Sequence, residues 1–282
     1  MAQIIDGKML SQKIRLKLKQ ETDNLKQVGI FPKLAVIMVG DNKASKLYVK
    51  NKSKACEQIG IEYEEYILDS NIQMKELINL IELLNNKEEI NGILLQSPIS
   101  NHLDINLAFK TIDYKKDVDG FNPLNIGKLV LGQNTFTPCT PLGIMRMLEE
   151  YNIKVEGANS VIIGRSNIVG KPLFQCLLNK NSTVTICHSK TKNISDITNR
   201  ADILFVALGK SRFITANMVK EGVVIIDIGI NRSDDGKISG DVDFEQVSKK
   251  ASYITPVPGG VGPMTVTMLM HNVIKAAKEQ AL

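Results

Sequence analysis

Residues 160–172 read SVIIGRSNIVGKP, and this segment predicts a strand, a tight turn and the start of a helix. The apolar run that ends at Gly164 is typical of a buried strand. Gly170 and Pro172 open the helix, because proline is tolerated in a first helical turn. Such a turn gathers free backbone N–H groups at the positive end of a helix dipole, where a pyrophosphate binds well. The segment therefore predicts an anion site in an α/β fold.

The spacing of the two glycines matches neither of the common phosphate-binding patterns. Five residues separate Gly164 from Gly170, so the segment is neither G-x-G-x-x-G nor a P-loop. The glycines still permit a sharp turn and let an anion approach the backbone. At this point an ordinary βα loop without a ligand is an open alternative.

The segment after the next predicted strand, residues 183–187, indicates which dinucleotide the turn would bind. NAD-binding domains commonly carry an acidic residue there, which accepts a hydrogen bond from the ribose 2′-hydroxyl. Here the strand leads into a segment with no acid, His188-Ser189-Lys190-Thr191-Lys192. Together with Arg165, these donors would attract a 2′-phosphate, which an aspartate would repel. The pattern favours NADP, with simply solvated lysines as the alternative.

Predicted strands and helices alternate along the chain in two series. The first covers residues 33–95 and the second residues 142–229, each in the order expected of a largely parallel sheet. Residues 115–140 are rich in Asp, Gly, Asn, Pro and Thr, which predicts a crossing between domains that carries functional loops. We expect an α/β protein of two domains, residues 1–139 completed by a C-terminal helix at 266–282, and a Rossmann-like parallel-sheet domain at 140–265.

The composition narrows the class of partner. The chain has 282 residues, a net charge of +5 and a sequence pI near 8.9. Its Lys and Arg residues are spread along the sequence, which argues against a nucleic-acid-binding arm and for a weak attraction of small anions. No stretch approaches the roughly 18 apolar residues of a membrane helix, and the first residues lack the apolar core of a signal peptide. We expect a cytoplasmic protein without nucleic-acid or membrane partners.

The cysteines and histidines are too far apart for the usual zinc or disulfide patterns. We therefore expect no metal site. Free, buried thiols in a reducing compartment are the better explanation of the four cysteines, Cys56, Cys139, Cys176 and Cys187.

One lysine lies on the apolar face of its predicted helix, residues 44–59. At about 100° per residue, this face also carries Val49 and Cys56. Lys52 falls in the middle of the face, four residues after Tyr48. Desolvation there would lower the pKa of the ammonium toward neutrality, as proton exchange at pH 7 requires. A lysine whose head group reaches water past its apolar neighbours is an equal alternative.

Two further polar residues follow predicted strands or loops, where the active sites of α/β proteins collect. Gln96 comes directly after the apolar run of residues 92–95, and Asp119 lies in the loop segment KDVDGF, residues 116–121. A carboxylate is a natural acceptor for the paired N–H donors of an aminopyrimidine ring. Taken alone, each residue is more typical of a turn or a helix cap.

Taken together, six segments in order resemble the bifunctional methylenetetrahydrofolate dehydrogenase/methenyltetrahydrofolate cyclohydrolase family. The resemblance covers nearly the whole chain. The segments are VGDNKAS with YVKNK (39–45 and 48–52), GILLQSP (92–98), KDVDGF (116–121), PCTPLG (138–143), GRSNIVGKP (164–172) and PVPGGVGPMT (256–265).

The resemblance implies a fold and two activities. The N-terminal domain would be catalytic, and a cleft would separate it from the NADP-binding domain. The enzyme would oxidise 5,10-methylenetetrahydrofolate to the methenyl form with NADP⁺, and would then hydrolyse the methenyl form to 10-formyltetrahydrofolate. The family is usually a homodimer that forms through the nucleotide domain.

The resemblance also implies roles for single residues. Lys52 would be the principal catalytic group, adjusted by Gln96. Tyr48 would stack on the folate, and Asp119 would anchor its pterin ring. A loop with Pro258 and Gly259 would lie beside the folate. The residues that would hold NADP are Gly164, Arg165, Ser166, Ser189 and Ile230.

The chain departs from the family pattern at two positions, and three alternatives stay open. Ser97 and Ser100 stand where the family usually has Leu and Pro, so we expect altered packing of this loop. Some relatives keep only one of the two activities. A different NADP-dependent Rossmann oxidoreductase would need an arginine clamp for a small acid and a base, which we do not find. A non-catalytic NADP-sensing protein would have no reason to place Lys52 beside Tyr48.

Overall fold

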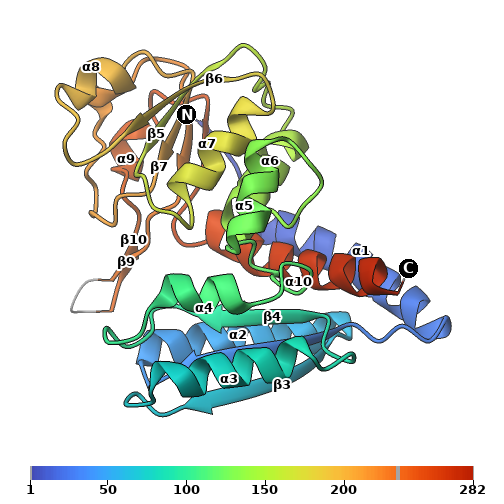
Figure 1. Cartoon of the computed structure of the whole chain (residues 1–282). Helices are drawn as coiled ribbons and strands as arrows, with labels where there is room; N and C mark the ends of the chain where they lie inside the picture. The colour runs from blue at the N-terminus through green and yellow to red at the C-terminus, as the bar shows by residue number, and fades with distance from the viewer. Residues whose placement is uncertain (1, 233–235, 282) are drawn as a thin grey trace. The chain divides into compact units, whose positions relative to one another are not determined.

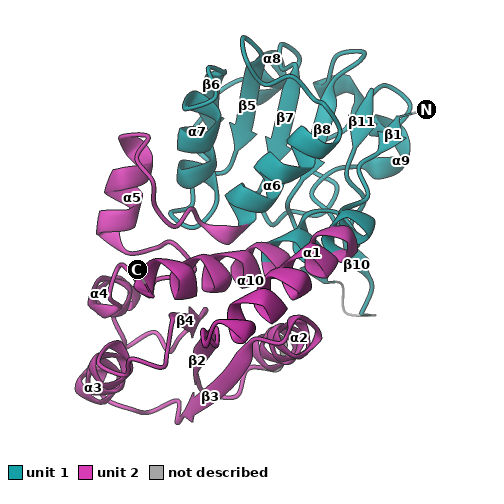
Figure 2. Ribbon diagram, turned by 90° about the vertical axis from the view of Figure 1, so that its right-hand side faces the viewer, with its two compact units in different colours: residues 1–11, 140–265 teal, residues 12–139, 266–282 magenta. Residues whose placement is uncertain are grey.

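The structure is a computed structural model that describes residues 2–232 and 236–281, and Figure 1 shows the order of its elements. The chain divides into two compact units, which Figure 2 colours separately. The first consists of residues 1–11 and 140–265, and the second of residues 12–139 and 266–282. We call them the Gly164 unit and the Lys52 unit.

A parallel sheet of six strands forms the centre of the Gly164 unit. The strands lie in the order β1-β11-β8-β7-β5-β6, as Figure 2 shows. Their bounds are β1 Gln3–Ile4, β5 Asn159–Ile163, β6 Thr183–Cys187, β7 Ile203–Val206, β8 Val224–Asp227 and β11 Tyr253–Ile254. Because β5 pairs with β6 on one side and with β7 on the other, the strand order reverses at β5. Ligands of open α/β sheets bind at the carboxyl ends of the strands beside such a reversal.

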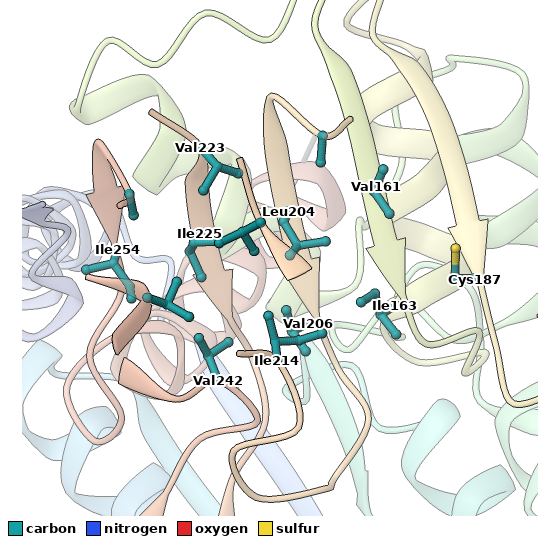
Figure 3. Packing of buried hydrophobic residues seen from close by; sticks show 14 residues of the cluster. Val161, Ile163, Cys187, Leu204, Val206, Ile214, Val223, Ile225, Val242 and Ile254 are labelled. Atoms are coloured by element: carbon teal, nitrogen blue, oxygen red, sulfur yellow. The ribbon is translucent and has the colours of Figure 1, made fainter. Parts of the chain in front are cut away.

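Alternate residues of these strands form an apolar layer on one face of the sheet (Figure 3). Val161 and Ile163 of β5 lie beside Leu204 and Val206 of β7, and each is at most 1% exposed. Strands that are buried on both faces are typical of parallel sheets with helices on either side.

The other elements of this unit are α6 Cys139–Glu150, α7 Gly170–Leu178, α8 Ile194–Thr198, η1 Ala216–Met218, α9 Phe244–Val247 and the antiparallel pair β9 Asn231–Arg232 and β10 Ile238–Ser239.

The Lys52 unit has a smaller parallel sheet, in the order β3-β2-β4. Its central strand is buried on both faces: Ala35, Ile37 and Val39 pack in one apolar cluster with α3, and α2 lies on the opposite face (Figure 2). The elements are β2 Lys33–Val39, α2 Lys43–Ile59, β3 Glu62–Leu68, α3 Met74–Asn85, β4 Gly92–Gln96, α4 Ile105–Thr111 and α5 Pro123–Val130. Two long helices, α1 Gly7–Gln27 and α10 Val261–Gln280, begin in the Gly164 unit and continue in the Lys52 unit.

The structure differs from the sequence prediction at two places. Residues 1–11 belong to the Gly164 unit, because β1 pairs with β11 and adds an edge strand to its sheet. A strand of two residues is too short to give a periodic pattern. The predicted loop of residues 115–140 contains α5, where the Asn122 side chain accepts a hydrogen bond from the N–H of Leu124 at 2.8 Å. Asn and Pro are typical of loops, but here they cap and begin a helix.

Two further observations concern the class of protein. No helix within the described residues is long and apolar enough to cross a membrane. The four cysteines are free and buried, which confirms the prediction made from their spacing.

Candidate active site

Lys52 and Gln96 meet at the carboxyl end of β4. Lys52 lies on α2, on the helical face that also carries the buried Val49 and Cys56. Its Nζ donates a hydrogen bond to Oε1 of Gln96 at 2.9 Å. Gln96 is the last residue of β4, and its Nε2 donates to the carbonyl oxygen of Ser97 at 2.6 Å. The second bond orients the amide so that its acceptor oxygen faces the lysine.

A carboxylate lies near this pair. Burial lowers the pKa of Lys52 below its usual value, and the negative charge of Asp119 opposes the shift. Burial raises the pKa of Asp119, while Lys52 and a hydrogen bond with Cys139 act in the opposite direction. The surroundings thus disfavour both charges. A lysine in such a place exchanges its proton at lower pH than a solvated lysine does.

Cys139 and Asn272 are two neighbours of this cluster that the sequence analysis did not place there. The Cys139 thiol donates to the carbonyl oxygen of Val118 at 3.4 Å, and burial raises the pKa of this thiol well above its usual value. Asn272 of α10 donates from Nδ2 to the same Val118 carbonyl at 2.8 Å and to that of Thr137 at 3.2 Å. These contacts hold the segment that carries Asp119. The PCTPLG segment was the only sequence signal for Cys139.

Tyr48 and the serines of the next loop complete the surroundings. Tyr48 lies one helical turn before Lys52 and keeps 40% of its surface exposed, so its ring offers a flat apolar face to a ligand. Ser100 donates from Oγ to the carbonyl oxygen of Ser70 at 2.7 Å, which ties the loop after β4 to the loop after β3. Ser97 and Ser100 leave the contact between Lys52 and Gln96 intact.

In the Gly164 unit, the predicted turn lies at the carboxyl end of β5. Gly164 has a φ of +126°, and a Cβ there would lie 2.3 Å from the carbonyl oxygen of Ala207. No other residue fits, because that φ is strained for L side chains and the space is filled. The register of β5 with its two neighbours places Gly164, His188 and Ala207 in a row at one edge of the sheet.

The sequence predicted free N–H groups at the start of α7, and this was wrong for three of them. Ser166 accepts from the N–H of Val169 at 3.1 Å and of Gly170 at 3.4 Å through Oγ, and from Lys171 at 3.0 Å through its carbonyl oxygen. Residues 165–168 are exposed, and the described part of the chain provides no acceptor for their backbone N–H groups. Because the Ser166 Oγ receives hydrogen bonds, its own O–H is left to donate to an anion.

The end of β6 carries donors and no acid beside this turn. His188 accepts at Nδ1 from the backbone N–H of Lys190 at 3.2 Å, and the backbone N–H of His188 donates to the Thr191 hydroxyl at 2.9 Å. These bonds shape a short turn that leaves Ser189 and Lys190 exposed. The cradle at Gly164 and the basic end of β6 therefore fit a dinucleotide with a 2′-phosphate.

The remaining predicted residues also lie in the Gly164 unit. Ile230 follows β8 and is 45% exposed. Pro258 and Gly259 follow β11, and the carbonyl oxygen of Gly259 accepts from the N–H of Lys8 at 2.9 Å. The structure thus groups Tyr48, Lys52, Gln96 and Asp119 in one unit and the predicted nucleotide residues, with Pro258 and Gly259, in the other.

Two family models match the chain. The model described as "Tetrahydrofolate dehydrogenase/cyclohydrolase, catalytic domain" matches residues 5–119, and the model of the NAD(P)-binding domain of the same description matches residues 138–281. "Bifunctional protein FolD" of Campylobacter hominis is 53% identical over 278 residues, which are 99% of this chain and 98% of that protein.

Solved structures agree with these matches. The bifunctional enzyme FolD of Campylobacter jejuni, a methylenetetrahydrofolate dehydrogenase/cyclohydrolase, superposes with a TM-score of 0.98 at 52% identity, covering 99% of both chains. The methylenetetrahydrofolate dehydrogenase-cyclohydrolase of Trypanosoma brucei, solved in complex with NADP cofactor and an inhibitor, has a TM-score of 0.95 at 34% identity and covers 99% of this chain and 98% of its own.

Proposed function

The chain belongs to the tetrahydrofolate dehydrogenase/cyclohydrolase family, and on this basis we propose that it catalyses two consecutive reactions of one-carbon metabolism. The first oxidises 5,10-methylenetetrahydrofolate to 5,10-methenyltetrahydrofolate with NADP⁺. The second hydrolyses the methenyl form to 10-formyltetrahydrofolate. The observation that carries the proposal is the hydrogen bond from the half-buried Lys52 to Gln96, because this pair suits the proton transfers of the second reaction.

The first reaction needs binding and orientation more than it needs a base. When bound, NADP⁺ supplies the acceptor for a hydride that leaves the methylene carbon with its electron pair. No hydroxyl proton is lost, so a dehydrogenase of this kind needs no His–Asp base. Tyr48 would stack on the folate, and the Asp119 carboxylate would accept paired N–H bonds from the pterin ring. Pro258 and Gly259 would border the folate.

The second reaction needs proton transfer at two atoms. Water adds to the cationic methenyl carbon and must lose a proton. One ring nitrogen must gain a proton as its bond to that carbon breaks. A lysine with a lowered pKa can accept the first proton as an amine and deliver the second as an ammonium. The hydrogen bond that Nζ donates to Gln96 would hold Nζ in place for both transfers, which supports Lys52 as the catalytic group.

The residues of the Gly164 turn would bind the phosphates. Gly164 gives the turn its shape, and the free N–H groups of residues 165–168 with the Ser166 hydroxyl are suitable donors to a pyrophosphate. Arg165 and Ser189 are exposed donors for the 2′-phosphate that separates NADP from NAD. Ile230 would offer apolar contact at the end of β8. We accordingly propose that residues 140–265 with the edge strand of residues 1–11 form the NADP-binding domain, and that residues 12–139 with 266–282 form the folate-binding domain.

One assay tests the proposed function. The purified protein is given 5,10-methylenetetrahydrofolate with NADP⁺ or with NAD⁺, while formation and decay of the methenyl form are followed by absorbance. We expect NADP⁺-dependent formation, followed by decay faster than the spontaneous hydrolysis. Formation of the methenyl form without accelerated decay would indicate a dehydrogenase that lacks cyclohydrolase activity. A protein that binds NADP⁺ without turning over the folate would be a sensor, and the proposal would fail.

We also propose that the protein is cytoplasmic and a homodimer. The free, buried thiols support a reducing compartment. The dimer rests on the family resemblance. Fractionation of cells and light scattering during gel filtration test the two statements, and a monomeric mass at micromolar concentration would contradict the second.

A further inference from the structure

Two aspartates of the Gly164 unit are buried and take no part in the function proposed above. Asp227 is the last residue of β8 and is 4% exposed, and Asp241 is 0% exposed. Neither carboxylate forms an ion pair within the described residues, so both depend on N–H donors. A buried carboxylate is costly unless such donors surround it, and this arrangement indicates that the two side chains organise the backbone around them.

Asp241 holds the loop that follows β7. Its Oδ2 accepts from the N–H of Leu208 at 2.6 Å and of Gly209 at 2.9 Å, and its Oδ1 accepts from the N–H of Lys210 at 2.8 Å. Oδ1 also accepts from the side-chain amide of Asn231 at 2.9 Å. One carboxylate therefore fixes three successive peptide groups and the residue that follows Ile230.

Asp227 in turn holds Asp241. Its Oδ1 accepts from the N–H of Asp241 at 3.0 Å and of Gly229 at 3.1 Å, and its Oδ2 accepts from Val242 at 3.0 Å. Each carboxylate also packs closely against a glycine of the neighbouring loop. A Cβ on Gly229 would lie 2.1 Å from Cγ of Asp241, and a Cβ on Gly240 would lie 1.9 Å from Oδ2 of Asp227. The two loops are packed against the carboxylates with no room for a side chain.

The strand order indicates what this support would serve. The ends of β6, β5, β7 and β8 follow one another along one edge of the sheet. The donors for a 2′-phosphate lie at the end of β6, and the turn for the pyrophosphate lies at the end of β5. A dinucleotide that continues in the same direction passes the ends of β7 and β8 with its nicotinamide half. Asp241 accepts hydrogen bonds from the segments that follow these two strands.

We propose that Asp241 is a positioning residue for the nicotinamide half of NADP. It acts through the backbone of residues 208–210 and through Asn231, and Asp227 keeps it in place. The inference rests on the proposed dehydrogenase function. It concerns neither the adenosine half nor the folate chemistry of the Lys52 unit, and this separation makes it testable.

The test compares Asp241→Asn with the wild-type protein and with a matched control. The asparagine presents an N–H₂ group to two N–H donors, so the variant loses two of the four bonds. Asp243→Asn makes the same change in charge two residues along, at a side chain with no hydrogen bond to it among the described contacts. Binding is measured with NADP⁺ and with 2′-phospho-ADP-ribose, which lacks only the nicotinamide ring. Amide hydrogen exchange is measured at residues 208–210.

For Asp241→Asn we expect faster exchange at residues 208–210 and a dehydrogenase kcat reduced about tenfold, as the loss of roughly 1.4 kcal/mol in the transition state would give. The affinity for 2′-phospho-ADP-ribose and the hydrolysis of supplied methenyltetrahydrofolate should stay within about twofold, the scatter that we allow for a distant site. Asp243→Asn should resemble the wild type in every respect.

Other outcomes would overturn the proposal. If Asp241→Asn shows faster amide exchange at residues 208–210 but an unchanged dehydrogenase kcat, Asp241 has only a structural role. An equal loss of affinity for NADP⁺ and for 2′-phospho-ADP-ribose would lead to the same conclusion. If Asp241→Asn does not fold, Asn231→Ala replaces it as the test variant, because it removes one donor to Oδ1 of Asp241. It should give the same pattern of effects, with the dehydrogenase kcat reduced about threefold. A wild-type protein without dehydrogenase activity would contradict the proposed function instead, while the exchange experiment would still report on the loop.

Discussion

At the scale of single residues, the chemistry proposed for this chain depends on the surroundings of the Lys52 ammonium group. Other lysines of α2, such as Lys50 and Lys54, are exposed, while Lys52 lies on the buried face and donates to Gln96. The same residue type on the same helix therefore lies in two different environments, one exposed and one beside Gln96. This contrast provides a control within one element.

Replacing Lys52 by methionine keeps the apolar stem and removes the amine. We expect Lys52→Met to lower the hydrolysis of methenyltetrahydrofolate by about 10²–10⁴-fold, the usual contribution of a general acid–base group. NADP⁺ affinity should stay unchanged. The matched control is Lys50→Met, on the exposed face, which should hydrolyse at the wild-type rate. Normal hydrolysis in Lys52→Met would remove this lysine from the mechanism.

The pH dependence of hydrolysis follows from the lowered pKa of Lys52. The neutral amine accepts the proton of water, and its fraction grows as pH rises through that pKa. The hydrolytic kcat should therefore increase with pH over a range that lies below the titration of a solvated lysine. Gln96→Glu would place a negative charge beside Nζ and raise the pKa, so the rise should move up by about one unit or more. A pH profile that does not move would contradict the assignment.

Asp119 is expected to contribute to folate affinity. If its carboxylate pairs with the pterin, Asp119→Ala should weaken folate binding by about 1.5–3 kcal/mol, the range for hydrogen bonds to a charged group. Titration calorimetry with a folate analogue measures the change. Asp23→Ala, at an exposed carboxylate of the same unit paired with Lys19, is the control. Equal affinities in the two variants would exclude Asp119 from the site.

The periodicity of α2 was sufficient to place Lys52 on the buried face. It could not supply the partner, because Gln96 is 44 positions away and its approach depends on how β4 pairs with β2. The family resemblance supplied the pair. Asn272 was missed for the same reason, since it reaches Val118 across 154 positions of sequence. Local patterns predict faces, whereas partners depend on the tertiary fold.

At the scale of elements, the strand-turn-helix at β5 and α7 was predicted because its apolar run and glycines are local signals. Strands β1 and β11 were not predicted, because they have two residues each. Helix α1 was not predicted either, because its buried Leu10, Leu18 and Leu25 are widely spaced among charged residues. Free N–H groups were expected at the helix start, but Ser166 accepts from two of them through its side chain and from a third through its carbonyl oxygen.

The turn after β5 should be intolerant of a single methyl group. Gly164→Ala combines a strained φ with a contact to the carbonyl oxygen of Ala207 at 2.3 Å. We expect a loss of unfolding free energy of about 1–3 kcal/mol and loss of NADP⁺ binding. Gly157→Ala is the matched control, because its φ is +74° and nothing lies within 4 Å of the new Cβ. If both variants bind NADP⁺ equally well, the turn is not the phosphate site.

At the scale of the whole molecule, ligand binding and stability are coupled. At about 100 times its dissociation constant, NADP⁺ should raise the unfolding free energy by about 2.7 kcal/mol. The same concentration of NAD⁺ should raise it less, because Arg165 and Ser189 would have no 2′-phosphate to bind. Arg165→Ala should reduce the difference between the two nucleotides. Thermal unfolding measures both effects, and equal stabilisation by NAD⁺ would contradict the preference for NADP.

The path of the chain has a consequence for biosynthesis. All residues of the Gly164 unit have been translated once residue 265 is added, whereas the Lys52 unit still lacks the part of α10 that brings Met270 to Cys56 and Asn272 to Val118. These contacts of the Lys52 unit therefore form only after every residue of the Gly164 unit has been added. A messenger truncated shortly after codon 265 would encode the Gly164 unit in full and the Lys52 unit without these contacts.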